Sequence, residues 1–94
     1  MQAWNRIILN TIIEDDFIEL ENFTWFEFRN NGTADVWLGY NSHTKQIRLE
    51  PKECIDFPRL ENGIYKGRIY IMFEGSGVKS ITYRAIAQSN QEII

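Results

Sequence analysis

The sequence predicts an all-β protein, a single antiparallel β-sandwich of the jelly-roll or immunoglobulin-like kind with about seven or eight short strands. Two observations lead to this prediction. Runs of β-branched and aromatic residues are separated by turn signals every ~8 to 12 residues, a spacing typical of sandwiches. The 94 residues contain no linker, repeat or low-complexity stretch, so we expect one domain over residues 1–94, with residues 1–13 and 88–94 as candidate arms. The strand order stays open.

The first third of the chain is predicted to hold a turn and then extended segments. Residues 11–22 partly fit one face of a helix, but their β-branched isoleucines and the absence of Ala favour extended chain. We therefore expect a turn at residues 14–16 followed by a strand. Residues 23–29 are rich in strand-forming aromatic residues, and Asn-Gly within residues 30–33 supplies the positive φ angles that a tight hairpin turn requires. Residues 35–40 are then the partner strand of that hairpin.

The rest of the chain is predicted to continue as short strands joined by turns. The expected strands lie at residues 47–50, 54–57, 68–73 and 78–87. The expected turns lie at residues 51–53, where Pro fixes φ, at residues 62–63, where Asn-Gly recurs, and at residues 74–77, where glycines make a hairpin turn. The strand at residues 68–73 has the clearest pattern, because Ile69, Ile71 and Phe73 alternate with residues directed to the other face.

The composition disfavours several classes of partner. The net charge is −3 with a pI near 5.1, and the ten Lys and Arg residues are scattered, so we expect neither a nucleic acid nor a membrane surface as a partner. No segment approaches the ~20 apolar residues of a membrane span. Residues 1–13 begin like a signal peptide, but Asn10 and Thr11 interrupt the apolar run, and acidic residues 14–16 stand where a cleavage site is needed. We therefore expect synthesis in the cytoplasm without an export signal.

The sequence carries no recognisable catalytic motif, so we expect no enzyme activity, no cofactor and no metal. His43 lies in a polar loop, and we interpret it as solvated because no motif places a nucleophile and an acid beside it. The single Cys54 cannot form an internal disulfide, and we interpret it as a small hydrophobe that points inward. Acidic residues 14–16 lack the spacing of a Ca²⁺ loop, and residues 74–77 lack the Lys of a phosphate-binding loop.

The aromatic content is the most informative feature of the composition. Six Phe, four Tyr and three Trp are more than the single inner layer of so small a sandwich easily buries. Alternation directs Trp37 and Tyr70 away from the apolar faces of their strands, and it places Phe23 with Trp25 on one face of residues 23–29. Rings outside the core have three explanations: cover by loops of the same chain, a protein–protein interface, or a platform for sugar rings. The candidate interface or ligand-stacking residues are Trp4, Trp25, Trp37 and Tyr70.

Two segments within residues 26–57 carry a resemblance to a known class of protein. Residues 26–40 contain Asn-Asn-Gly followed by Val-Trp-Leu-Gly, and residues 47–57 contain Leu-Glu-Pro-Lys-Glu before another strand. This pattern is similar to small β-sandwich structural proteins of bacteriophage virions, namely head decoration proteins, minor capsid proteins and fibre or tail modules. In that pattern Gly is usual at the position of Lys52, so the chain departs from it at this turn.

The resemblance implies a non-enzymatic structural protein, made in the host cytoplasm and located in the virion. Its partners would be copies of itself and other virion proteins, and the short apolar segments near both chain ends would reach neighbouring subunits. The alternative is a carbohydrate-binding β-sandwich module in which Trp25, Trp37 and Tyr70 stack on a glycan. Neither hypothesis specifies the number of subunits or a place in a particle.

Overall fold

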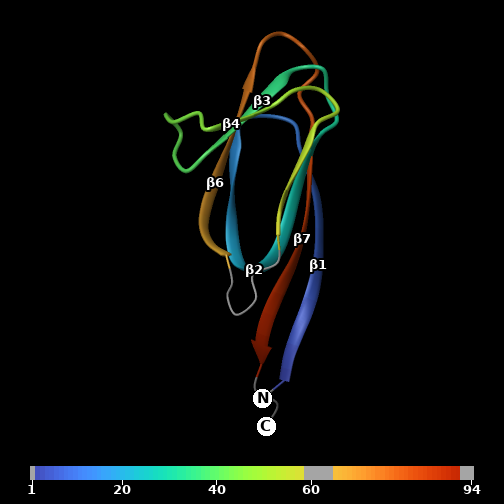
Figure 1. The fold of residues 1–94 in the computed structure, drawn as a ribbon, viewed down its shortest axis with the longest axis vertical. Helices are drawn as coiled ribbons and strands as arrows, with labels where there is room; N and C mark the ends of the chain where they lie inside the picture. Colours follow the sequence, from blue (N-terminus) through green and yellow to red (C-terminus); the bar gives the residue numbers. More distant parts are fainter. Residues whose placement is uncertain (1, 59–64, 92–94) are drawn as a thin grey trace.

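The computed structural model describes residues 2–58 and 65–91, and β-strands make up most of them (Figure 1). The strands are β1 (Gln2–Ile12), β2 (Asp16–Asn30), β3 (Asp35–Gly39), β4 (Ile47–Leu49), β5 (Cys54–Phe57), β6 (Tyr65–Glu74) and β7 (Ile81–Gln91). Every pairing between them is antiparallel, which confirms the predicted all-β class. No helix in these residues is long and apolar enough to cross a membrane. The predicted turn at residues 62–63 and the end of the predicted C-terminal arm, residues 92–94, lie outside the described residues.

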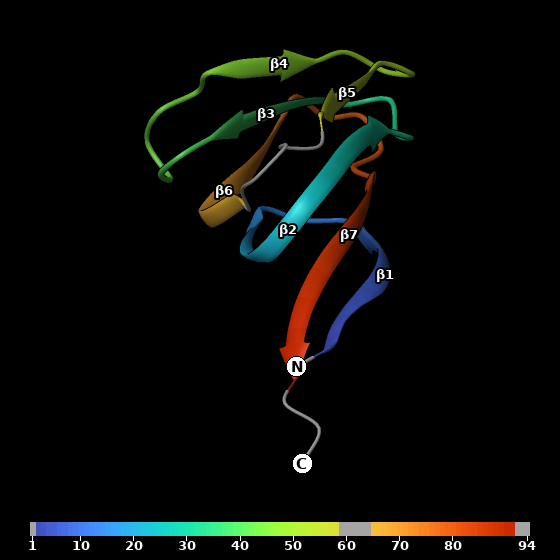
Figure 2. The same cartoon turned by 60° about the horizontal axis from the view of Figure 1, so that its bottom comes forward.

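The strands form one sheet that curls around the core in a sandwich-like arrangement. Their order is β1-β7-β2-β6-β3-β4, and β5 pairs with β2 off this path. Since β7 and β5 both pair with the second half of β2, they lie on its opposite edges, and β5 and β6 follow one another along the same edge. Figure 2 shows β3 and β4 at one end of the curl and β7 and β1 at the other. The sequence did not predict the strand order. The order in the structure places the first strand, β1, beside the last strand, β7.

β1 and β7 are each 11 residues long and lie side by side, so that the start of β1 lies beside the end of β7 (Figure 1). β2 pairs with β7 only as far as Phe23, which lies opposite Ala87. Beyond that point β1 and β7 continue as a two-stranded ribbon, and the molecule is 52 Å long but only 22 Å wide. Ile12 is buried in the core and Ile8 packs against it. The second half of the predicted N-terminal arm, residues 1–13, therefore packs against the hydrophobic core and does not project as an arm.

β2 is 15 residues long and bends in its middle, which changes the side-chain faces expected from the sequence. Its register against β6 shifts at Asn22, where φ is 60°, and its register against β7 shifts at Thr24. Each shift is a β-bulge, which inserts a residue that has no cross-strand partner. The second bulge returns Phe23 to the face of Phe26, and both are buried, while Trp25 points to the outer face. The prediction that Phe23 and Trp25 share a face is wrong, because alternation holds only without a bulge.

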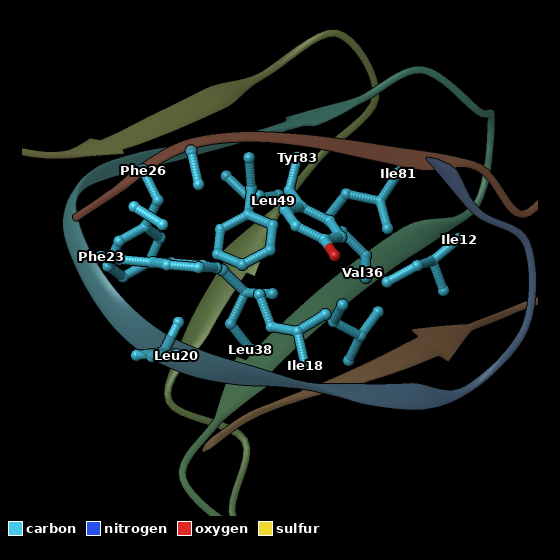
Figure 3. Close-up of a cluster of buried hydrophobic side chains, with 14 residues drawn as sticks. Ile12, Ile18, Leu20, Phe23, Phe26, Val36, Leu38, Leu49, Ile81 and Tyr83 are labelled. Carbon is cyan, nitrogen blue, oxygen red and sulfur yellow. The ribbon is translucent and has the colours of Figure 1, made fainter. Parts of the chain in front are cut away.

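Aromatic and branched side chains fill the core, pointing inward from strands all round the curl (Figure 3). The largest fully buried side chains are those of Phe26, Phe28, Ile71, Ile81, Val36 and Asn30. Phe26 stacks face to face on Phe57 with ring centroids 4.3 Å apart, and Tyr65 meets Phe26 edge-on at 4.9 Å. Such pairs contribute about 0.5–1.5 kcal/mol each beyond the burial of their area. All phenylalanines except Phe17 belong to the core or pack against it, so the core holds much of the aromatic excess.

Two of the predicted turns do not close hairpins. β2 and β3 flank residues 30–33, but β3 pairs with β4 and β6, and β2 pairs with β5, β6 and β7. Likewise, β6 and β7 flank residues 74–77 and lie on opposite edges of β2. Both hairpin predictions are therefore wrong as strand pairings. A local turn signal determines a change of direction, and in this curled sheet the chain then continues to a strand elsewhere in the sheet.

The turn after β2 is instead held against the segment that leads into β7. Four backbone hydrogen bonds of 2.9–3.1 Å join residues 31–34 to the carbonyl groups of Ser80 and Val78. Gly32 does not have the positive φ that the hairpin prediction required. It is needed for space, because a Cβ atom there would lie 2.1 Å from the carbonyl oxygen of Val78.

Candidate interaction surface

The aromatic residues singled out from the sequence do not form one surface. Trp37 of β3 and Tyr70 of β6 lie on the outer face of one half of the sheet, and both are partly buried. Trp25 of β2, also partly buried, lies opposite Ile86 of β7 on the outer face of the other half. Trp4 belongs to β1, in the two-stranded ribbon. The structure therefore does not bring Trp25, Trp37 and Tyr70 together as a platform.

Trp37 has partners within its own chain. Its indole N–H donates a hydrogen bond to Glu74 Oε2 at 2.7 Å, and Lys45 Nζ lies over the ring, 5.8 Å from its centroid. Lys45 also forms an ion pair with the same Glu74 oxygen at 3.1 Å. The hydrogen bond from Lys45, followed by the one from Trp37, lowers the pKa of the Glu74 carboxyl below its ordinary value. Because a cation already lies over this ring, the ring is poorly suited to stacking on a sugar.

Tyr70 also contacts side chains of the neighbouring strand. Its ring centroid lies 5.5 Å from that of Phe17, which is directly opposite in the β2–β6 register. The guanidinium of Arg68 lies 4.6 Å from the Phe17 ring centroid, and its Nε donates a hydrogen bond to Glu19 at 2.6 Å. This outer face thus combines rings with paired charges, as is common on a solvated sheet surface.

A more exposed apolar surface lies on the outer face of β1, β7 and β2. Ile7, Ile86 and Trp25 lie directly opposite one another across these three strands. Leu9 follows Ile7 by two residues and therefore shares its face of β1. Ile7 is 85% exposed and Leu9 is 66% exposed. We call Ile7, Leu9, Ile86 and Trp25 the outer apolar patch. Exposed apolar side chains grouped on one face are common at sites where proteins contact other molecules.

The sequence predictions included only Trp25 from the outer apolar patch. Ile7 and Leu9 lie in an uncharged run, residues 7–13, in which the intervening Ile8 is apolar as well, so alternation along the sequence does not distinguish an inner face from an outer one. The sequence predicts an apolar arm over residues 1–13 without indicating which of its side chains are exposed. The sequence does not indicate Ile86 either, because the exposure of this residue depends on which strands lie beside β7.

β1 is an edge strand with little protection against further pairing. Within the part of the chain that the structure describes, it pairs with β7 on one side only. The Thr11 N–H group donates to Oδ1 of the preceding Asn10 at 2.9 Å, so it faces the free edge, and by alternation the backbone groups of Leu9 and Ile7 face the same edge. Residues 7–13 contain neither a charged residue nor a proline. Soluble proteins usually place such residues on edge strands, because an unpaired edge is a template for another strand.

A groove of about 340 Å³ separates β1 from the first half of β2. It is lined by Arg6, Ile8, Asn10 and Ile12 of β1, by residues 16–19 and Phe23 of β2, and by Tyr83 of β7. The first half of β2 pairs with β6 along the edge that faces away from the groove. In the same half of β2, the N–H group of Phe17 donates a hydrogen bond to Asp16 Oδ1 at 2.8 Å. Ile12, Phe23 and Tyr83 belong to the core. The groove therefore runs between two strand edges and reaches core side chains.

Side chains capable of catalysis or metal binding are dispersed. His43 is exposed in a loop, as the sequence predicted. Cys54 is exposed as well, and the prediction that it points inward is wrong, because Ile55 takes an inner position of that strand. Asp15 and Asp16 each accept a hydrogen bond from a backbone N–H group. Within residues 2–58 and 65–91, no group of three His, Cys, Asp or Glu side chains is arranged to hold a metal ion.

The chain was compared with family models, curated proteins and solved structures, and nothing in any of the three comparisons matches it. Its most distinctive parts are the outer apolar patch and the adjoining free edge of β1.

Proposed function

We propose that this protein is a non-enzymatic structural component of a phage virion, a capsid decoration, minor capsid or tail and fibre protein. It acts by self-association and by docking on other virion subunits. The observation that carries the proposal is the outer apolar patch beside the uncharged free edge of β1. Such a surface suits a permanent contact, since obligate interfaces are more apolar than ordinary protein surface. The resemblance of residues 26–57 to β-sandwich proteins of phages suggests that the assembly is a phage virion.

The turn at Lys52 supports that resemblance. The N–H group of Glu53 donates to the carbonyl of Glu50 at 3.0 Å, which closes a four-residue turn, and Lys52 has a φ of 73°. Pro at the second position and a positive φ at the third are features of a type II turn, in which Gly is preferred at the third position. Pro51 and Lys52 occupy these two positions. The backbone thus has the conformation that Gly would adopt in the phage pattern.

Two observations test whether the chain belongs to a phage virion. We expect genes for capsid, portal or tail proteins beside the gene for this chain. We also expect mass spectrometry of purified virions, from a phage whose genome encodes the chain, to detect it in many copies. Virions that lack the chain would contradict the proposal.

Carbohydrate binding is the weaker alternative, because Trp25 lies on a different half of the sheet from Trp37 and Tyr70. A glycan array separates the two hypotheses. Under the proposal, the wild-type chain gives no signal on the array. A specific glycan signal that Trp25→Ala or Trp37→Ala abolishes, without loss of β-structure, would favour the alternative, as would a neighbouring glycosidase gene.

A further inference from the structure

We infer that two copies of this chain pair edge to edge through β1, antiparallel and about a twofold axis at Ile8. The two sheets then become one continuous sheet across the axis. This inference rests on the proposed function, because it identifies the partner in self-association as a second β1. Three features carry it: an unpaired edge, a self-complementary order of residues along that edge, and complementary charges beside it.

The order of residues in β1 selects the register. In a twofold antiparallel pair, hydrogen-bonded residues must oppose one another, and the backbone groups of Ile7, Leu9 and Thr11 face the free edge. An axis at Ile8 places Ile7 of each copy opposite Leu9 of the other. An axis at Leu9 would instead place Arg6 opposite Ile12, a charged residue against an apolar one. An axis at Ile7 would place Arg6 opposite Ile8, again a charged residue against an apolar one, and an axis at Asn10 would pair only residues 8–12 of the strand. The axis at Ile8 pairs residues 4–12 and avoids both, so it is favoured.

This register joins the outer apolar patches of the two copies. Within one copy, Trp25, Ile86 and Ile7 form a row across three strands, and Leu9 lies beside Arg84 rather than beside an apolar side chain. After pairing, Leu9 of the second copy continues that row next to Ile7. The most exposed members of the patch, Ile7 and Leu9, thus gain apolar cross-strand neighbours, and the contact occurs twice by symmetry.

The charges at the groove fit the same register. Arg6 lies opposite Asn10 of the second copy, and Asn10 lines the groove together with Asp16. Among the described residues, neither Arg6 nor Asp16 has an ion-pair partner. Arg6 and Asp16 of one copy line this groove without forming an ion pair, and pairing brings Arg6 of the second copy to the same groove, where Asp16 supplies a carboxylate. The groove between β1 and β2 is then occupied by β1 of the second copy.

Cysteine cross-linking tests the register directly. Ile8 opposes itself across the axis as a pair without hydrogen bonds, for which the Cα separation is about 4.5 Å, within the range of a disulfide. In a Cys54→Ser background, we expect Ile8→Cys to form a disulfide-linked dimer in air, seen on a non-reducing gel. Thr11→Cys is the matched control on the same strand. It should not cross-link, because residue 11 opposes residue 5 of the second copy.

The outcomes separate the pairing mode from the proposed function. If light scattering shows that the wild-type chain associates but Ile8→Cys does not cross-link, or cross-links no better than Thr11→Cys, the β1 pairing is wrong and self-association stands. If the wild-type chain is a strict monomer at high concentration, both are contradicted.

A charge exchange tests the same register without altering an apolar residue, and it decides the question if Ile8→Cys fails to fold. Arg6→Glu should weaken association about tenfold, and adding Asp16→Arg should restore it. Association that neither substitution changes would contradict the pairing.

Discussion

The side-chain amide of Asn30 donates a hydrogen bond to the backbone carbonyl of Leu49 at 3.0 Å, which joins the end of β2 to β4. The same amide donates to the carbonyl of Ala34 at 2.8 Å, and Oδ1 accepts the N–H of Gly32 at 3.0 Å. Asn30 is 0% exposed. One buried side chain therefore satisfies three backbone groups at the point where the chain leaves β2.

Replacing Asn30 with Ala should lower the free energy of unfolding by about 2–3 kcal/mol, because buried backbone groups lose their partners. Urea denaturation measures this loss. The exposed neighbour provides the control, since Asn31→Ala should cost less than about 0.5 kcal/mol. Equal losses for the two variants would show that the buried hydrogen bonds of Asn30 contribute little.

Lys52→Gly should stabilise the protein by about 0.5–1 kcal/mol, because the residue has a φ of 73° and a side chain is disfavoured in that region. The gain is measured as a higher midpoint of thermal unfolding. Lys52→Ala keeps a Cβ atom in the same conformation and should give no gain. A loss of stability in Lys52→Gly would argue against the type II turn.

The pKa of Glu74 should depend on Trp37. Lys45 and Trp37 both donate to the Glu74 carboxylate and hold its pKa below the ordinary value. A depressed pKa in the folded state means that these contacts stabilise the protein when the carboxyl is ionised, and that the contribution is lost as pH falls through the folded-state pKa. NMR titration of the Glu74 carboxyl should show a higher pKa in Trp37→Phe. The control Tyr70→Phe should leave the pKa unchanged, and an equal pKa in wild type and Trp37→Phe would contradict the assignment.

The positions of most strands could be predicted from the sequence, because they depend on local patterns. The expected segment 54–57 coincides with β5, and the expected segment 47–50 contains β4 and one residue more. The turn expected at residues 14–16 falls between β1 and β2, with Asp16 already in β2. Pairing partners could not be predicted, since a turn signal does not say which strand lies beside the next one. The bulges in β2 were also invisible, because Asn22 and Thr24 are ordinary strand or turn residues in the sequence.

The candidate surface could be predicted only in part for the same reason. Trp25 was found because tryptophan is conspicuous on any strand face. Ile7 and Ile86 become one surface only when β1 lies beside β7, and that contact joins the two ends of the chain. The exposure of Cys54 was mispredicted because a strand of four residues offers two alternating faces, and burying Ile55 leaves Cys54 outside.

Sedimentation equilibrium of the wild-type chain beside Leu9→Lys tests the central claim most directly. We predict that the wild-type chain associates, and that a charge on the free edge of β1 raises its dissociation constant at least about tenfold. Val78→Lys is the matched control, because Val78 is 64% exposed, close to the 66% of Leu9, but lies outside the outer apolar patch. A wild-type chain that stays monomeric at high concentration, or an equal effect of both lysines, would contradict assembly through β1.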